Sequence, residues 1–232
     1  PNNATLVITG DINQEDAKNY INKYFSSIPK GASEIKRPLV SDALLTEPIV
    51  DSVYDNIQLK AVFQAYKIPK QGTKDAYALD MLSTLLSNGK SSRLNVALKE
   101  EKQMAVQTAG FSMSFESGGF FATLGFPNQG YTASDVRVAI VKEIEKVQKD
   151  LISEKEFQKI QNITETNFVS SNSRMDGIAE SLADYHMMFG NADLINTELE
   201  KYRAVTREDI KRVANKYLVQ NNSVTLYYLP KK

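Results

Sequence analysis

The stretch MAVQTAGFSMSFESGGFFATLGF, residues 104–126, decides the fold class of this chain. Ser117-Gly118-Gly119 near its middle is a hairpin-type turn, because glycines allow the tight reversal that joins two antiparallel strands. Before the turn, apolar side chains recur at every second position, and these are Ala109, Phe111, Met113 and Phe115. A period of two is that of a strand with one apolar face. We therefore predict adjacent antiparallel strands over residues 104–115 and 120–126.

Upstream, the first thirty residues combine a short apolar run with an amphipathic helix. Residues 4–9 (ATLVIT) predict a buried strand that Gly10 ends. Asn13 is the expected helix N-cap, and one helical face carries Ala17, Tyr20, Ile21, Tyr24, Phe25 and Ile28. Residues 31–50 contain Gly31, Pro38 and Pro48 and show no period, so we predict a linker there. The flanking ranges 1–30 and 51–232 are then separate packing units, or one unit joined by a crossing segment.

The remaining elements also favour a layered α+β domain. Residues 57–65 alternate as a half-buried strand, residues 75–86 have helical periodicity, and a second helix begins at Ser91 or Ser92. Four or five helices follow the hairpin, two of them with capping boxes, and a last strand spans residues 224–229. The capping boxes are Ser153 with Glu156 and Thr206 with Asp209. We predict a mostly antiparallel sheet covered on one face by helices.

Composition excludes several classes of function. The 232 residues carry 28 basic and 28 acidic side chains with no dense run of either sign, so we expect no nucleic-acid partner. We also expect no membrane span, because no apolar run is long enough. The absence of Cys removes disulfides and thiolate metal sites. The chain opens at Pro1 within a strand pattern, which we interpret as a fragment. Its Lys/Asn-rich composition leans towards a bacterial periplasm or cell envelope without deciding the compartment.

No cluster of catalytic residues is evident in the sequence. A catalytic zinc usually takes three protein ligands, often from H-E-x-x-H or H-x-x-E-H, whereas this chain has the single histidine His186. We therefore expect no metal in this chain and assign His186 to packing or to the surface. Residues 88–91 (NGKS) lack the first glycine of a phosphate loop, so we interpret them as a helix-to-helix turn with Gly89 as the C-cap. No G-x-S-x-G nucleophile elbow is present.

Several segments, in order along the chain, resemble the C-terminal part of the insulinase family of zinc metallopeptidases, which includes pitrilysin and the mitochondrial processing peptidase. Residues 1–11 (PNNATLVITGD) and 24–29 (YFSSIP) are similar to the strand and helix that close the family's preceding half-domain. Residues 89–94 (GKSSRL) resemble its G-x-S-S-R-L turn, and residues 205–218 resemble a late helix. The resemblance implies a tail over 1–30 that closes the preceding half-domain or packs on the same sheet, a linker over 31–50 and an α+β half-domain over 51–232.

The resemblance also implies a division of labour between two halves that close around an unfolded peptide. Zinc is expected on the other half, which belongs to the same chain or to a partner subunit; a homodimer is a further assembly to consider. The family's second half contributes an Arg and a Tyr seven residues apart, and the aligned residues here are Lys99 and Val106. Lys99 can still contact a substrate carbonyl as a point charge, whereas Val106 has no donor. We therefore predict no catalytic residue in this chain and a minor substrate contact at Lys99.

Three functions remain open after this comparison. The first is the non-catalytic half of an active zinc metallopeptidase, and the second is a catalytically dead family member acting as a structural, assembly or peptide-binding subunit. The third is a peptide-binding module without any proteolytic context. Because all of them use one fold, fold alone does not decide among them.

Overall fold

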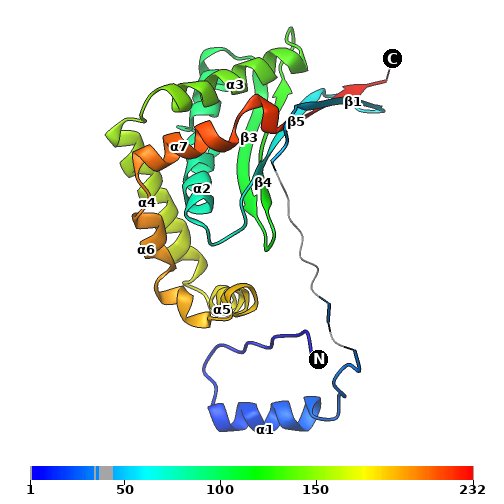
Figure 1. Cartoon of the computed structure of the whole chain (residues 1–232), viewed down its shortest axis with the longest axis vertical. Coiled ribbons are helices and arrows are strands. Elements are labelled where there is room, and N and C mark those ends of the chain that lie inside the picture. The colour runs from blue at the N-terminus through cyan, green and yellow to red at the C-terminus, as the bar shows by residue number, and fades with distance from the viewer. Residues whose placement is uncertain (1, 34, 37–43, 232) are drawn as a thin grey trace. The chain divides into compact units, whose positions relative to one another are not determined.

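A computed structural model describes residues 2–33, 35–36 and 44–231 (Figure 1). The chain divides into two compact units. The first, here called the tail unit, combines Pro1–Leu39 with Glu165–Leu199. The second, the sheet unit, combines Val40–Thr164 with Glu200–Lys232. Among the described residues, no helix has both the length and the apolar character needed to cross a bilayer.

The sheet unit is built on one five-stranded sheet with the order β1-β5-β2-β4-β3. Its strands are β1 (Ile49–Asp55), β2 (Ala61–Ile68), β3 (Ala105–Ser114), β4 (Gly119–Pro127) and β5 (Ser223–Pro230). Among the described residues, β1 and β5 pair in parallel, and the other three pairings are antiparallel. The predicted hairpin is confirmed as β3 and β4, with Met113 opposite Phe120 next to the turn.

Helices cover one face of this sheet, as Figure 1 shows for α2, α3 and α7. Their bounds are Lys74–Ser87 for α2, Ala133–Lys149 for α3 and Arg207–Tyr217 for α7. The predicted capping box of Thr206 and Asp209 is present, and Ser153 with Glu156 forms the other one. The core lies between the layers, where Val62, Tyr66 and Phe121 of the sheet meet Leu82, Leu85, Ile140, Ile144 and Val213 of the helices. The predicted fold class, an α+β domain with a mostly antiparallel sheet, is confirmed.

The tail unit contains α1 (Gln14–Phe25), the end of α4 (Glu154–Ser171), α5 (Met175–Phe189), the 3₁₀-helix η2 (Ala192–Asn196) and the start of α6 (Glu198–Arg203). Asn13 caps α1 as predicted. No described hydrophobic residue of this unit is buried. Such a unit lacks the apolar core that offsets the entropy of folding.

Several sequence predictions differ from the structure, and two of them concern strands at the edge of the predicted sheet or outside it. Residues 4–9 are not a strand, since within the described chain they pair with no other strand and leave Leu6 and Ile8 exposed. An extended segment becomes a strand only when a neighbour satisfies its backbone groups. Conversely, β1 begins at Ile49, inside the range predicted as a linker, because β5 supplies a parallel partner. Residues 34 and 37–43 of that predicted linker lie outside the described residues.

Candidate functional site

The predicted site residues Lys99 and Val106 flank a turn that joins two irregular elements. Lys99 lies in η1 (Asn95–Glu101), which is a π-helix, and is half-buried. Val106 lies near the start of β3 and is 44% exposed. π-helical turns are rare in proteins, and those that do occur often lie at functional sites. The segment 95–106 is therefore the first place to search for a site.

A charged pair fixes the beginning of this segment. Arg93 donates two parallel hydrogen bonds to the carboxylate of Glu156, with Nε to Oε1 at 2.9 Å and Nη2 to Oε2 at 3.0 Å. Glu156 also accepts from Ser153 at the start of α4. Hydrogen bonds from Arg93, together with those from Ser153, outweigh partial burial and lower the pKa of Glu156 to about 2. The pair thus ties the turn before η1 to α4.

The turn after η1 holds an unusual backbone conformation at Gln103. Its φ of 49° lies in the left-handed region, which glycine adopts at little cost and other residues rarely do. Asn128 stabilises the turn twice, since its side chain donates to the carbonyl of Gln103 and its backbone N–H donates to the carbonyl of Met104, each at 2.9 Å. The backbone N–H of Met104 in turn donates to the carbonyl of Leu98 at 2.9 Å.

A β-bulge presents Val106. The pairing of β3 with β4 shifts between Ala105, opposite Pro127, and Gln107, opposite Phe126, so Val106 is the extra residue. Bulges of this kind re-aim side chains and are common next to active sites. Val106 is exposed there, whereas its neighbour Ala105 is buried. The chain therefore has a bulge at the position where the sequence resemblance predicts Tyr, and the side chain there is apolar.

The side of the sheet away from the helices forms a broad apolar surface, here called the open face. Strand register places on it Ile49, Asp51, Val53 and Asp55 of β1; Ala61, Phe63, Ala65 and Lys67 of β2; Gln107, Ala109, Phe111 and Met113 of β3; Phe120, Ala122, Leu124 and Phe126 of β4; and Val224, Leu226 and Tyr228 of β5. The alternate residues of the central strands β2 and β4 are buried under the helices. By contrast, Phe63, Phe111, Met113 and Val224 are between 37% and 43% exposed. A surface of this kind usually marks an interaction site.

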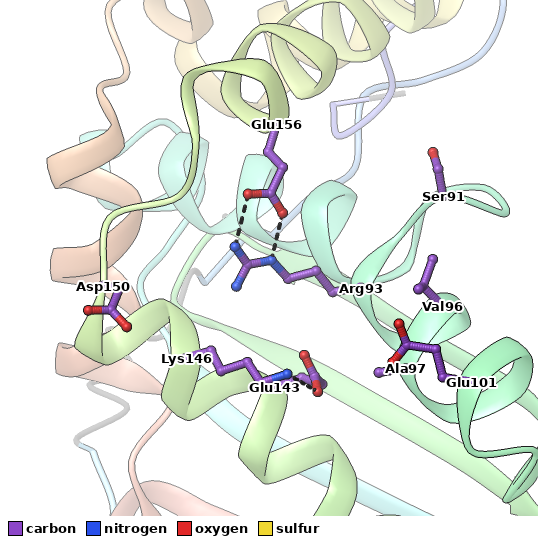
Figure 2. Close-up of a pocket in the computed structure, with 9 residues that line it drawn as sticks. All are labelled: Ser91, Arg93, Val96, Ala97, Glu101, Glu143, Lys146, Asp150 and Glu156. Carbon is purple, nitrogen blue, oxygen red and sulfur yellow. Dashed lines mark hydrogen bonds and ion pairs between the residues drawn. The ribbon is translucent and has the colours of Figure 1, made fainter.

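A cavity of about 470 Å³ lies between η1, the end of α3 and the start of α4 (Figure 2). Its charged side chains include the Arg93–Glu156 pair and Lys146, which donates to Glu143 at 2.7 Å. The Arg93–Glu156 pair links two elements of the wall, which also carries the carboxylates of Glu101 and Asp150, so we regard this cavity as part of the framework that holds η1. In the described part of the chain, no three His, Cys, Asp or Glu side chains come together as metal ligands would. His186 is exposed at the end of α5.

The sequence analysis did not predict the left-handed backbone of Gln103, the bulge at Val106 or the open face of the sheet. Nothing local in the sequence indicates the left-handed Gln103 or the bulge at Val106, because a neighbouring strand and Asn128 impose them. The open face could be read from the period-two pattern of β3, but the residues of β5 join it only through tertiary pairing. The structure places Lys99 and Val106 at the two ends of one turn, and their roles remain predictions.

Known proteins resemble this chain in sequence. A model of the family described as the peptidase M16 inactive domain matches residues 1–164. The chain is 27% identical over 236 residues to the zinc protease PqqE of Helicobacter pylori, covering 99% of this chain and 52% of that protein. The chain thus spans about half the length of that curated relative.

Solved structures agree with this match. A protease from Helicobacter pylori superposes with a TM-score of 0.88 at 27% identity, over 95% of this chain and 54% of that one. A peptidase M16 inactive domain from Pseudomonas fluorescens superposes with a TM-score of 0.78 at 15% identity, over 96% of this chain and 52% of that one, a likeness of fold alone. The half-domain fold expected from the sequence resemblance is confirmed.

Proposed function

Because this chain belongs to the family of the peptidase M16 inactive domain, we propose that it is the non-catalytic half of a zinc metallopeptidase, contributing a wall of the compartment that receives unfolded peptides. In this proposal the other half holds a zinc ion. When bound there, the ion would polarise the peptide carbonyl and activate water. The observation that carries the proposal is the open face, which ends at the exposed bulge residue Val106. An apolar wall suits unfolded chains, since these expose the side chains that folded proteins bury.

The tail unit supports a second part of the same proposal. In this proposal residues 1–30 close the preceding, zinc-bearing half-domain, which is one of the two placements that the sequence resemblance implies, and residues 51–232 form the peptidase half-domain. The apolar face of α1 supports this, because Tyr20, Tyr24 and Phe25 are each more than half exposed. A partner surface would supply the burial that the unit does not provide for itself.

The direct experiment combines this chain with the zinc-bearing half encoded upstream or in a partner gene. Hydrolysis of an unfolded fluorogenic peptide is expected only when both halves are present, and a chelator should abolish it. The 232-residue chain alone should bind no zinc and cleave nothing. Stoichiometric zinc binding with peptide cleavage by the chain alone would refute the proposal.

One observation favours a second function, in which the chain belongs to a catalytically dead family member that acts as a structural, assembly or peptide-binding subunit. The position aligned with the family's oxyanion donor carries Val106, and loss of one such donor typically costs about 10² to 10³ in rate. Turnover by the two-half assembly decides between these functions. Replacing both residues by the family pair, Lys99→Arg with Val106→Tyr, should raise turnover in an active peptidase and leave a dead one silent. A hundredfold loss in Lys99→Ala would show instead that this half takes part in catalysis.

A further inference from the structure

The cavity between η1, the end of α3 and the start of α4 carries an excess of negative charge. Four carboxylates and two basic side chains line it, which leaves a net of two negative charges. The carboxylates belong to Glu101, Glu143, Asp150 and Glu156, and the basic groups to Arg93 and Lys146. Because the whole chain has 28 basic and 28 acidic residues, this excess is a local property of the cavity.

Glu143 is a buried carboxylate with one oxygen unused. Its side chain lines the cavity and is 4% exposed, and its Oε1 accepts a hydrogen bond from Nζ of Lys146 at 2.7 Å. Among the described residues, no group donates to Oε2. Burial of an ionised carboxylate is costly unless several donors satisfy it, and such a group can accept about four hydrogen bonds. Lys146, whose side chain is 61% exposed, meets only part of this requirement.

Two further carboxylates of the cavity also lack a partner within the described chain. Glu101 ends η1 and Asp150 is the C-cap of α3, and both residues are exposed. Figure 2 shows Glu143 between them. The three carboxylates are therefore spread along the cavity, whereas a metal ion needs its oxygen ligands gathered around one point. This distribution suits an extended organic cation.

The apolar part of the wall indicates which kind of cation fits. Ala97 is buried and Val96 is half-buried, and both lie on η1 beside the cavity. A methylene chain is stabilised by covering such atoms, and an ammonium group is stabilised by charge-assisted hydrogen bonds to carboxylates. We propose that the cavity binds alkylammonium groups, which free aliphatic polyamines and the lysine side chains of peptides both carry. Its volume of about 470 Å³ lies in the range of small-ligand sites.

The ammonium group donates to Oε2 of Glu143 while Lys146 keeps Oε1. Its methylene stem covers Val96 and Ala97, which lie on the same element as Glu101. In a polyamine, a second ammonium group then pairs with Glu101. The proposal goes beyond the proposed function and does not depend on it, because the sheet unit of this chain forms the whole cavity without a zinc-bearing half.

Isothermal titration calorimetry on the intact 232-residue chain tests the proposal. The probes are spermidine, a capped tripeptide with one central lysine, and Mg²⁺ as an inorganic cation, each at about 50 mM salt, where exposed charges are only partly screened. The variants are Glu143→Gln, Glu101→Gln and Lys146→Gln. The matched control is Glu145→Gln, which removes the same charge from an exposed position of α3 outside the cavity. Circular dichroism confirms the folding of each variant.

We expect spermidine to bind with a Kd below about 1 mM. Glu143→Gln should weaken this binding about tenfold or more, and Glu101→Gln about threefold, because each variant removes a charge that the ligand contacts. Lys146→Gln should tighten it about threefold, since both oxygens of Glu143 become available to the ligand. Glu145→Gln should change it by less than about twofold. If Glu143→Gln does not fold, the opposite effects of Glu101→Gln and Lys146→Gln decide.

The two probes that carry ammonium groups identify the source of the ligand. Tighter binding of spermidine supports the proposal with a free polyamine as the ligand, and binding of the lysine peptide alone supports it with a peptide side chain as the ligand. The proposal is overturned if neither probe binds, or if Mg²⁺ displaces spermidine at equal concentration. It is also overturned if Glu145→Gln weakens binding as much as Glu101→Gln, because the attraction would then belong to the surface as a whole.

Discussion

Removing the negative charge of Glu156 should destabilise the sheet unit in a strongly pH-dependent way. Glu156→Gln keeps the shape of the side chain and an acceptor for Ser153, but it loses the charge that Arg93 binds at 2.9 and 3.0 Å. A pKa lowered from 4.5 to about 2 corresponds to at most about 3.4 kcal/mol. Side-chain exposures of 20% for Arg93 and 29% for Glu156 admit solvent screening, so we expect about 1–2 kcal/mol at pH 7.

The sign of the pH dependence follows from the depressed pKa. The stabilisation by ionised Glu156 is fully present above the unfolded pKa of about 4.5 and is lost as pH falls towards about 2. The free energy of unfolding, measured in urea, should therefore differ between wild type and Glu156→Gln by less than half as much at pH 3 as at pH 7. The control is Glu200→Gln, which removes the partner of Arg203 at a site 67% exposed and should cost less than about 0.5 kcal/mol. An unchanged difference at both pH values, or none at pH 7, would show that the pair does not anchor η1.

Three further substitutions test the framework around the site. Gln103→Gly should stabilise the chain by about 0.5–1 kcal/mol and raise its Tm by about 1–4 °C, because relief of the left-handed conformation exceeds the added unfolded-state entropy; a lower Tm in calorimetry would contradict this. Gly125→Ala should cost about 1–3 kcal/mol in urea unfolding, since its Cβ would overlap Cγ1 of Val136, and a neutral result would mean that α3 can shift. Burial opposes the charged form of Asp75, but hydrogen bonds from basic and phenolic groups of α7 hold its pKa at about 2. Asp75→Asn should therefore lower the free energy of unfolding by about 2 kcal/mol at pH 7, and by progressively less between about pH 4 and pH 2.

Local signals in the sequence were sufficient for elements that stabilise themselves. The hairpin follows from Ser117-Gly118-Gly119 and the alternation beside it, and α7 follows from the capping box of Thr206 and Asp209. In both cases the partner groups lie within a few residues of one another, so the sequence window contains the whole interaction. The turn after α2 was predicted in part, since Gly89 adopts φ of 80° in that turn, whereas the C-cap of α2 is Asn88 rather than the predicted Gly89.

Elements that depend on distant partners could not be predicted in the same way. The strand β1 forms because Ile49 lies opposite Val224 of β5, far away in the sequence, and its own IVDSVYD stretch does not indicate that partner. The opposite error occurred at residues 4–9, whose composition suits a strand but which pair with no strand in the described chain. Both cases reflect one property of sheets, namely that strand formation is decided by a neighbour's backbone rather than by propensity.

The left-handed turn and the bulge bear on how this half relates to catalysis. Gln103 has a backbone conformation that suits glycine, and Asn128 holds it by donating to the carbonyls of both Gln103 and Met104. The bulge that exposes residue 106 likewise forms with Val at the position where the sequence resemblance predicts Tyr. The backbone geometry at this site therefore does not depend on the side chains of residues 103 and 106. It follows that Val106→Tyr would place a phenol on an existing bulge without rebuilding the strand, so failure of that variant to change turnover would reflect the chemistry of the assembly rather than distortion of this half.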